Sequence, residues 1–280
     1  FAFKLMEAMR PKASAIASEL ITERLGKGPV DFLGEVAAQI PARIIADVLG
    51  IPRSDLPVFM KWISDTAESI GFIDVERRAA IEQSLTEFNA YVDGLLADRR
   101  ANPRDDILTE LAHAKYMDGS TPEVYDIVQL GMFMFGAGQD TSAKLLGNAM
   151  KYLVEMPELQ DRLRADPKEI PAFLEEVLRI EGSTKQTARL ARKDTKIGDV
   201  AIPAGTKILV ALSAANRDPR RWDNPNELVL GRKKIMEHVG FGRGKHVCAG
   251  APLARVEVRV IMEKFLAKTA RIELARDHPP

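Results

Sequence analysis

The sequence predicts a mainly α-helical protein with one small β region, folded as a single domain over residues 1–280. Through the first two thirds of the chain, apolar residues recur at helical spacing in segments separated by short breaks at glycine and proline. The alternation of apolar and polar residues that is typical of strands is confined to residues 195–210, around a Pro-Ala-Gly turn at 203–205. No internal repeat, low-complexity tract or linker divides the chain, which favours one domain.

Four helical patterns come first, each followed by a break. They cover residues 11–26, 36–49, 54–70 and 75–99. Gly50, directly after the second pattern, has the position of a left-handed C-cap, because glycine adopts positive φ without strain and a proline follows two residues later.

A much longer helical pattern begins near Ser120 and meets no strong stop before Pro157. The string Ser-Thr-Pro-Glu at 120–123 combines an N-cap, a proline in the first turn and a capping box. A helix of about 35 residues would be ~52 Å long, so we expect it to pass through the core. Residues 216–231 are rich in Asn, Pro, Asp and Gly and predict irregular structure, and a last helical pattern then extends from Cys248 to about Thr269.

The composition limits the classes of protein to which the chain can belong. Its 280 residues are 46% hydrophobic, with 40 basic and 40 acidic side chains, which predicts a soluble globular protein that interacts mainly with neither nucleic acid nor anionic membranes. No apolar run reaches the ~20 residues of a membrane span. A single cysteine excludes an intrachain disulfide and suits a reducing cytoplasm. Because the chain begins at Phe1 and not at methionine, we expect an N-terminal part of the protein to be missing from it.

The single cysteine, Cys248, lies in a glycine-rich segment immediately before the last helical pattern. Glycines let a backbone approach a bulky group without a Cβ in the way, and a helix N-terminus lowers the pKa of a nearby thiol. A thiolate presented in this way suits a soft metal centre such as heme iron. One alternative is a zinc site with His246, which would need four ligands. Another is a nucleophilic cysteine with a histidine base, which would leave the glycine spacing unexplained.

Six fixed positions define the pattern F-G-x-G-x-H-x-C-x-G, and they are Phe241, Gly242, Gly244, His246, Cys248 and Gly250. This pattern resembles the heme-binding loop of the cytochrome P-450 family, and the resemblance extends over nearly the whole chain. It implies a cytochrome P-450-like helical domain with heme b between the long central helix and the cysteine loop, and Cys248 as the iron ligand. It also places His246 and Arg189 at positions that bind heme propionates, to which imidazole and guanidinium groups are suited donors.

The middle of the long helical pattern carries a second motif, Gly-Ala-Gly-Gln-Asp-Thr at residues 136–141. Each glycine inside a helix costs about 1 kcal/mol relative to alanine. The two glycines therefore indicate either a groove for a flat group or close packing against another helix. The Thr141 hydroxyl can donate to a carbonyl of the preceding turn. The motif resembles the family's A-G-x-D-T, which implies that Ala137 and Gly138 contact the heme and that Asp140 and Thr141 deliver protons for oxygen activation.

Glu176 and Arg179 stand three residues apart in a helical pattern, a spacing that is common on solvated helix faces. In its place before the cysteine segment the pair resembles the family's E-x-x-R, which implies a buried structural ion pair that holds the loop region under the heme. The family usually adds an arginine where this chain has Glu227. Glutamate cannot donate to Glu176, so we expect Arg232 or a backbone group to take that role.

The resemblance also predicts which residues line the substrate pocket. They are Met132, Phe133, Phe135, Gly136 and Ala137 from the long helix, and residues 184–187, including Lys185 and Gln186. Lys185 has two interpretations. Either a bulge turns its ammonium to solvent, or strand alternation directs it into the pocket, where it would need an anionic partner on the substrate or a heme propionate.

The resemblance carried by these residues implies a cytoplasmic, bacterial-type heme-thiolate monooxygenase that hydroxylates a small apolar substrate with dioxygen. Electrons would come from NAD(P)H through a ferredoxin or flavodoxin and its reductase. One alternative is a peroxide-driven heme-thiolate enzyme, which would not need Asp140 and Thr141. The other is a heme sensor or carrier on the same fold, without catalytic activity.

Overall fold

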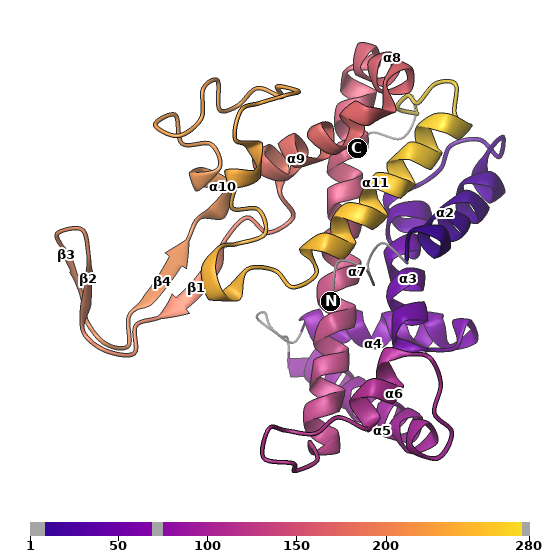
Figure 1. The fold of residues 1–280 in the computed structure, drawn as a ribbon, viewed down its shortest axis with the longest axis vertical. Helices are drawn as coiled ribbons and strands as arrows, with labels where there is room; N and C mark the ends of the chain where they lie inside the picture. Colours follow the sequence, from indigo (N-terminus) through magenta and orange to yellow (C-terminus); the bar gives the residue numbers. More distant parts are fainter. Residues whose placement is uncertain (1–8, 69–74, 276–280) are drawn as a thin grey trace. The chain divides into compact units, whose positions relative to one another are not determined.

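The computed structural model of the protein describes residues 9–68 and 75–275 and is mainly helical (Figure 1). The chain divides into two compact units, one formed by Asp31–Ala143 and the other by Phe1–Val30 together with Lys144–Pro280. Helix α7, Val124–Glu155, contributes to both units because the boundary falls within it. The organisation as a single domain stays a prediction.

The unit Asp31–Ala143 is built of helices. Its elements are the π-helical turn η1 (Phe32–Ala37), α3 (Gln39–Leu49), the 3₁₀ turn η2 (Arg53–Asp55), α4 (Leu56–Glu68), α5 (Val75–Ala101), α6 (Ile107–Ala112) and the first part of α7. Aromatic rings join α4 to α5. Phe59 meets Phe88 edge-on with centroids 4.8 Å apart, and Trp62 lies 5.4 Å from Tyr91. Burial of these rings stabilises the contact, since aromatic side chains bury large apolar areas.

The buried Arg99 holds the chain reversal after α3. Gly50 ends α3 with a φ of 72°, the left-handed C-cap that the sequence predicts. Arg99 Nη2 donates to the Gly50 carbonyl at 2.7 Å, and Arg99 Nε donates to Asp106 at 2.7 Å. Asp106 in turn caps α6 by accepting the Thr109 N–H at 2.8 Å. One guanidinium therefore links the end of α3, helix α5 and the start of α6, a short helix that the sequence pattern did not predict.

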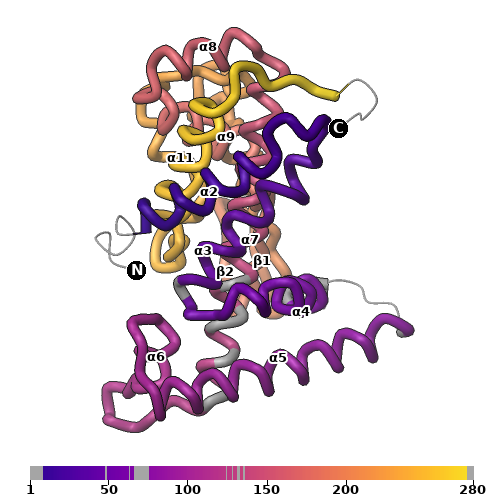
Figure 2. The backbone as a smooth tube through the Cα atoms, turned by 90° about the vertical axis from the view of Figure 1, so that its right-hand side faces the viewer, coloured from indigo at the N-terminus to yellow at the C-terminus, as the bar shows by residue number. Residues whose placement is uncertain are grey.

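The other unit combines α2 (Arg10–Arg24) with the chain from Lys144 onward. Its further helices are the second part of α7, α8 (Pro157–Ala165), the 3₁₀ turn η3 (Pro167–Glu169), α9 (Ile170–Glu181), α10 (Leu212–Ala215), the 3₁₀ turns η4 (Ile235–Glu237) and η5 (Gly244–His246), and α11 (Ala251–Lys268). Helix α2 lies along α11 in both Figure 1 and Figure 2, and Lys268 Nζ donates to the Thr22 hydroxyl at 2.8 Å. Helix α9 is buried along most of its length, including its central glutamates Glu175 and Glu176.

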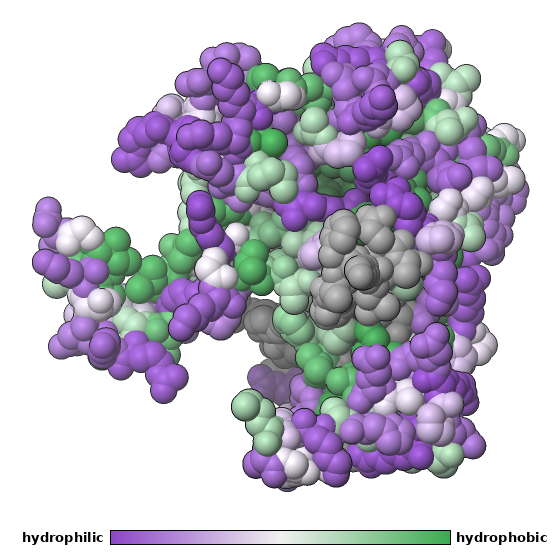
Figure 3. All heavy atoms as spheres, viewed as in Figure 1, coloured by the Kyte–Doolittle hydropathy of each residue, from purple (hydrophilic) through white to green (hydrophobic). Residues whose placement is uncertain are grey.

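The β region consists of two antiparallel pairs. β1 (Thr187–Leu190) pairs with β4 (Lys207–Val210), and β2 (Thr195–Ile197) pairs with β3 (Val200–Ile202). The predicted β region therefore exists, but its first strand lies before residue 195. The β2–β3 hairpin extends away from the helices of its unit (Figure 1), and Figure 3 shows apolar side chains exposed on the β region.

One predicted helix start is wrong. α7 begins at Val124, four residues after Ser120. The Ser120 N–H and hydroxyl both donate to Asp118 Oδ1, at 2.9 and 2.6 Å, so they form a local turn and the predicted capping box is not made. The ends of α7 and α11 agree with the prediction, whereas the 36–49 pattern divides into η1 and α3. Over the described ranges 9–68 and 75–275, none of the helices combines the length and hydropathy of a membrane-crossing segment.

Candidate functional site

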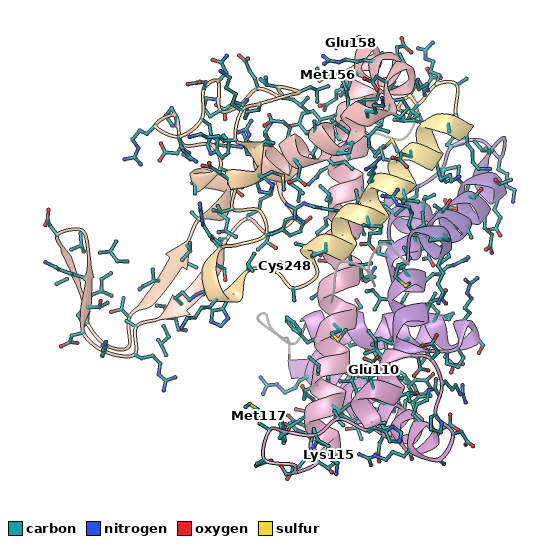
Figure 4. All side chains as sticks on the ribbon, in the orientation of Figure 1. Glu110, Lys115, Met117, Met156, Glu158 and Cys248 are labelled. Atoms are coloured by element: carbon teal, nitrogen blue, oxygen red, sulfur yellow. The ribbon has the colours of Figure 1, made fainter. Side chains whose placement is uncertain are left out.

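Cys248 lies on the loop that leads into α11 (Figure 4), and backbone hydrogen bonds define the shape of this loop. The Cys248 N–H donates to the Phe241 carbonyl at 2.9 Å, and the Gly242 N–H donates to the Val239 carbonyl at 2.9 Å. Gly242 and Gly244 have φ angles of 71° and 78°, which a residue with a Cβ adopts only with strain. Glycine at these two positions therefore lets the loop close back on itself and present the cysteine, whose side chain is exposed.

The donor set of this loop distinguishes between the kinds of metal centre considered from the sequence. Within residues 9–68 and 75–275 there is no group of three or more His, Cys, Asp and Glu side chains that could hold a metal ion, which does not fit a structural zinc site. One exposed thiol on a glycine-rich turn fits a centre that takes a single protein ligand, as heme does. A Cβ on Gly250 would lie 3.8 Å from the Cys248 sulfur, an ordinary van der Waals contact, so the space beside the sulfur does not by itself require glycine there.

The two predicted propionate-binding residues are exposed in the same unit as Cys248. His246 is the last residue of η5, two positions before the cysteine. Arg189 lies in β1, where its Nη1 donates to the Thr187 hydroxyl at 3.0 Å and to the Ala188 carbonyl at 2.7 Å. Both are donors in positions accessible to a carboxylate, and their assignment to the propionates stays a prediction.

Glu176 and Arg179 form a fully buried, two-pronged ion pair on α9. Arg179 Nε and Nη2 donate to the two Glu176 carboxylate oxygens, each at 2.9 Å, and both side chains are at most 1% exposed. Arg232 Nε donates to the same carboxylate at 2.7 Å, and the Val229 N–H donates at 3.0 Å. Burial, the largest influence on this carboxyl, favours its neutral form, yet the hydrogen bonds from Arg179, Val229 and Arg232 hold the pKa of Glu176 below its ordinary value.

Arg179 and Arg232 also bind the backbone of Glu227, the residue that stands where the family usually has an arginine. Arg179 Nη2 and Arg232 Nη2 donate to the Glu227 carbonyl, at 3.0 and 3.1 Å, so this residue contributes its backbone to the network. Arg179 Nη1 also donates to the carbonyls of Asn216 and Pro225, at 2.9 and 2.7 Å. Both expected substitutes for the family's arginine are therefore present: Arg232 and a backbone N–H. Together they hold the irregular segment after α10 against α9.

Within the unit Asp31–Ala143, the glycine motif of α7 forms the predicted threonine hydrogen bond and packs closely against a neighbouring helix. The Thr141 hydroxyl donates to the Ala137 carbonyl at 2.6 Å, the bond to the preceding turn that the sequence suggests. A Cβ on Gly138 would lie 2.9 Å from Ile45 Cδ1, so Gly138 allows α7 to pack closely against α3. The close-packing interpretation thus accounts for Gly138. Asp140 and Ala137 are exposed, and the roles predicted for them stay predictions.

Comparison with known proteins decides the family. The family model described as cytochrome P450 matches residues 43–270. The chain belongs to the cytochrome P450 family. Curated relatives include Cytochrome P450 144 of Mycobacterium tuberculosis, 31% identical over 98% of this chain and 63% of the relative. 6-Deoxyerythronolide B hydroxylase of Saccharopolyspora erythraea is also 31% identical, over 99% of this chain and 67% of the relative.

A solved structure supports the same fold. Substrate-free CYP150A6 of Mycobacterium marinum has a TM-score of 0.85 and 40% identity, over 97% of this chain and 63% of that chain. The predicted fold, a cytochrome P450 helical fold with a small β region, is confirmed, as is its likeness to bacterial members. The cofactor of this family is heme. The chain spans about 63% of the length of the first curated relatives that it matches.

The residues predicted to line the cytochrome P450 substrate pocket are only partly described. The side chains of Met132 and Phe135 lie outside the described residues. Phe133 is 70% exposed, and Gly136 is partly buried in α7. Gln186 is exposed in the segment between α9 and β1. Their assignment to the pocket stays a prediction.

The contacts of Lys185 bear on the two alternatives that the sequence left open. The strand that would alternate its side chains begins at Thr187, so Lys185 precedes it and strand alternation does not orient it. Lys185 Nζ donates to Glu181 Oε2 at 2.5 Å and remains 54% exposed. Its anionic partner is therefore a glutamate of the chain itself, and the solvent-facing alternative is the one that the structure favours.

Three residues that sequence reasoning missed lie beside the cysteine loop. Glu175, the neighbour of Glu176 on α9, accepts hydrogen bonds from Arg255 of α11 and contacts His238, which is buried just after η4. The sequence offered only one signal, a second glutamate in a helix pattern whose neighbouring positions are apolar. A buried charged group needs a partner, but no spacing rule identifies one that lies 63 or 80 residues away.

Proposed function

We propose that Cys248 is the thiolate ligand of a heme iron and that the protein is a monooxygenase. In this proposal a small apolar substrate is hydroxylated with dioxygen and electrons relayed from NAD(P)H. The observation that carries it is the exposed cysteine on a turn shaped by two positive-φ glycines and by the Cys248 N–H bond to the Phe241 carbonyl. Membership of the cytochrome P450 family supports the same conclusion.

When bound, the heme would supply the activation of dioxygen, which an electron-rich thiolate ligand favours. The chain's own residues would hold the heme and manage protons. His246 and Arg189 would donate to its carboxylates. The Thr141 hydroxyl, which donates to the Ala137 carbonyl at 2.6 Å, and the exposed Asp140 carboxylate would supply protons for the reaction.

An electron-transfer partner of the ferredoxin or flavodoxin type, with its reductase, completes the proposal. Arg243 and Lys245 are exposed in the loop that presents Cys248. Their positive charge suits an acidic protein surface, because complementary charge accelerates encounter. The composition, with its single cysteine, supports a cytoplasmic location.

The first experiment is the absorption spectrum of the full-length protein after reduction and binding of carbon monoxide. We expect the red-shifted Soret band that thiolate ligation produces, and we expect Cys248→Ser to lose it. A Cys248→Ser protein that kept this band would show that another residue binds the iron. Heme-loaded wild type without the band would refute thiolate ligation.

A turnover assay separates monooxygenase function from the alternatives. Product formed with dioxygen, NADPH, a surrogate ferredoxin and its reductase supports the monooxygenase. Product formed only when peroxide replaces this system would indicate a peroxide-driven enzyme, against which the presence of Asp140 and Thr141 argues. A protein that binds heme and ligands but turns over in neither system would be a sensor or carrier.

A further inference from the structure

Glu175 begins a second hydrogen-bonded network on α9, distinct from that of Glu176. Arg255 Nε and Nη2 donate to the two Glu175 oxygens at 2.6 and 3.1 Å, and His238 Nε2 lies 2.7 Å from Glu175 Oε2. The His238 side chain is 1% exposed and that of Glu175 10% exposed, while Arg255 extends toward solvent at 34%. The network thus joins α9, α11 and the loop after η4, three segments of one unit.

The hydrogen bonds of His238 define where its proton lies. The Gly240 N–H donates to His238 Nδ1 at 3.0 Å, so Nδ1 acts as the acceptor. The proton therefore lies on Nε2 and is donated to Glu175. Burial, the largest influence on Glu175, favours its neutral form, but the hydrogen bonds from His238 and Arg255 keep its pKa below the ordinary value. His238 is thus a neutral bridge between a charged carboxylate and a backbone N–H of the loop.

The His238 bridge ends at Gly240, one residue before Phe241. Phe241 has contacts through both its side chain and its backbone. The Arg255 guanidinium lies 4.6 Å from the centroid of the Phe241 ring, and the His238 ring lies 6.3 Å from it. The Phe241 carbonyl accepts the Cys248 N–H. Gly240 is confined as well, since a Cβ there would lie 3.1 Å from both His238 Nδ1 and the Leu178 carbonyl. A chain of contacts therefore runs from Glu175 to the backbone of the cysteine.

Asn216 connects the Glu176 network to the backbone of Val239, the residue after His238. The Val239 N–H donates to Asn216 Oδ1 at 2.8 Å, and the Asn216 carbonyl accepts from Arg179 Nη1 at 2.9 Å. The two adjacent glutamates on α9 therefore hold different segments of the chain. Glu176 holds the irregular segment after α10, and Glu175 holds the cysteine loop.

We propose that Glu175, His238 and Arg255 are positioning residues for Cys248, which fix Phe241 and thereby the orientation of the sulfur toward the iron. The proposal rests on the heme-thiolate function given above. Second-shell hydrogen bonds of this kind orient a ligand and adjust the metal that it binds. Loss of the bridge frees the loop between Gly240 and Cys248 without removing the ligand itself.

The test uses four variants of the full-length, heme-loaded protein. His238→Leu removes both hydrogen bonds of the imidazole, and Glu175→Gln removes the charge that holds His238 and Arg255. His238→Asn is a partial rescue, because its side-chain oxygen can reach the place of Nδ1 and still accept from Gly240, whereas its amide nitrogen does not reach the place of Nε2 beside Glu175. Glu169→Gln is the matched control, since Glu169 also forms a two-pronged pair, with Arg162 at 2.6 Å for both contacts, but on the exposed surface.

Two readouts are compared with wild type. Hydrogen–deuterium exchange at the Gly240 and Cys248 amides should be about tenfold faster in His238→Leu and Glu175→Gln, which corresponds to ~1.4 kcal/mol of lost protection. In the same two variants, part of the reduced carbon monoxide complex should lose the red-shifted Soret band. His238→Asn, which keeps the acceptor for Gly240 but not the bond to Glu175, should lie between wild type and His238→Leu in both properties, and Glu169→Gln should match wild type.

Unchanged exchange at both amides together with a complete red-shifted band in His238→Leu and Glu175→Gln would overturn the proposal. So would a loss limited to thermal stability and heme content, since that is all a purely structural role predicts. If His238→Leu does not fold, Glu175→Gln and His238→Asn decide by the same readouts. If heme-loaded wild type lacks the red-shifted band, the heme-thiolate function fails, and the amide exchange alone then decides whether the network positions the loop.

Discussion

Two arginine–glutamate pairs in the same unit have nearly the same geometry and opposite surroundings. Arg179 and Glu176 meet through two hydrogen bonds of 2.9 Å and are completely buried, whereas Arg162 and Glu169 meet through two of 2.6 Å at the surface. The buried carboxylate has two further partners, Arg232 and the Val229 N–H. The surface pair has the shorter contacts, so distance alone does not make the buried pair the more important one for stability. What matters is whether water can replace a partner that a substitution removes. Water replaces it at the surface, and nothing does in the interior.

Arg179→Ala should have the largest effect. It leaves Glu176 buried with fewer donors and removes the bonds to three backbone carbonyls, those of Asn216, Pro225 and Glu227. Removal of one partner of a buried pair costs roughly 3–5 kcal/mol of unfolding free energy. The yield of folded, heme-loaded protein should therefore fall sharply. A normal yield with only slower turnover would contradict the structural role.

Arg232→Met should have an intermediate effect, because Arg179 and the Val229 N–H still bind the Glu176 carboxylate. The variant loses one hydrogen bond to the buried carboxylate, which costs about 1–3 kcal/mol, and also the Arg232 bonds to the carbonyls of Asp223, Asn224 and Glu227. Denaturant unfolding of the variant measures this loss. An effect as large as that of Arg179→Ala would show that Arg232, and not Arg179, is the main partner of Glu176.

Acid titration should separate the two carboxylates. The folded-state pKa of Glu176 is lowered, so its stabilising contribution is present above the unfolded value of about 4.3 and is lost as the pH falls through the folded value. The stability difference between wild type and Glu176→Gln should therefore shrink below about pH 4. The pKa of Glu169 is lowered as well, by its bond to Arg162, but added salt should remove most of the effect of Glu169→Gln. Equal salt dependence of the stability of Glu176→Gln and Glu169→Gln would contradict the contrast between the buried and the surface pair.

Arg162→Ala should have the smallest effect. Both members of this pair are accessible to water, so solvent takes over the hydrogen bonds that the variant loses. Its thermal unfolding midpoint should stay close to that of wild type, measured beside Arg179→Ala in the same buffer. A loss comparable to that of Arg179→Ala would show that geometry outweighs burial.

Much of the fold could be predicted because it depends on local sequence. Glycine at position 50 ends α3 through a positive φ that only glycine adopts without strain, and Pro157 limits α7 in the same local way. The exceptions are also local. Ser120 and Asp118 compete with a helix cap by forming their own turn, and the pattern at 36–49 does not reveal a π-helical turn before α3.

The candidate site was predictable to the same extent. The sequence by itself determined the family, the single thiol, the glycines that shape its loop and the helical spacing that brings Glu176 to Arg179. Each of these depends on residues at most a few positions apart, where backbone geometry fixes the relation.

Only the tertiary structure decided which distant groups meet. It selected Arg232 for Glu176 across 56 residues, His238 for Glu175 across 63, and Ile45 as the neighbour that Gly138 must accommodate. It also gave Lys185 a partner within the chain, Glu181, where the sequence left a choice between solvent and pocket. The physical reason is that a buried charge or a helix crossing requires a partner, and the local sequence is enough to predict that such a partner exists. The partner itself is set by how the whole chain packs.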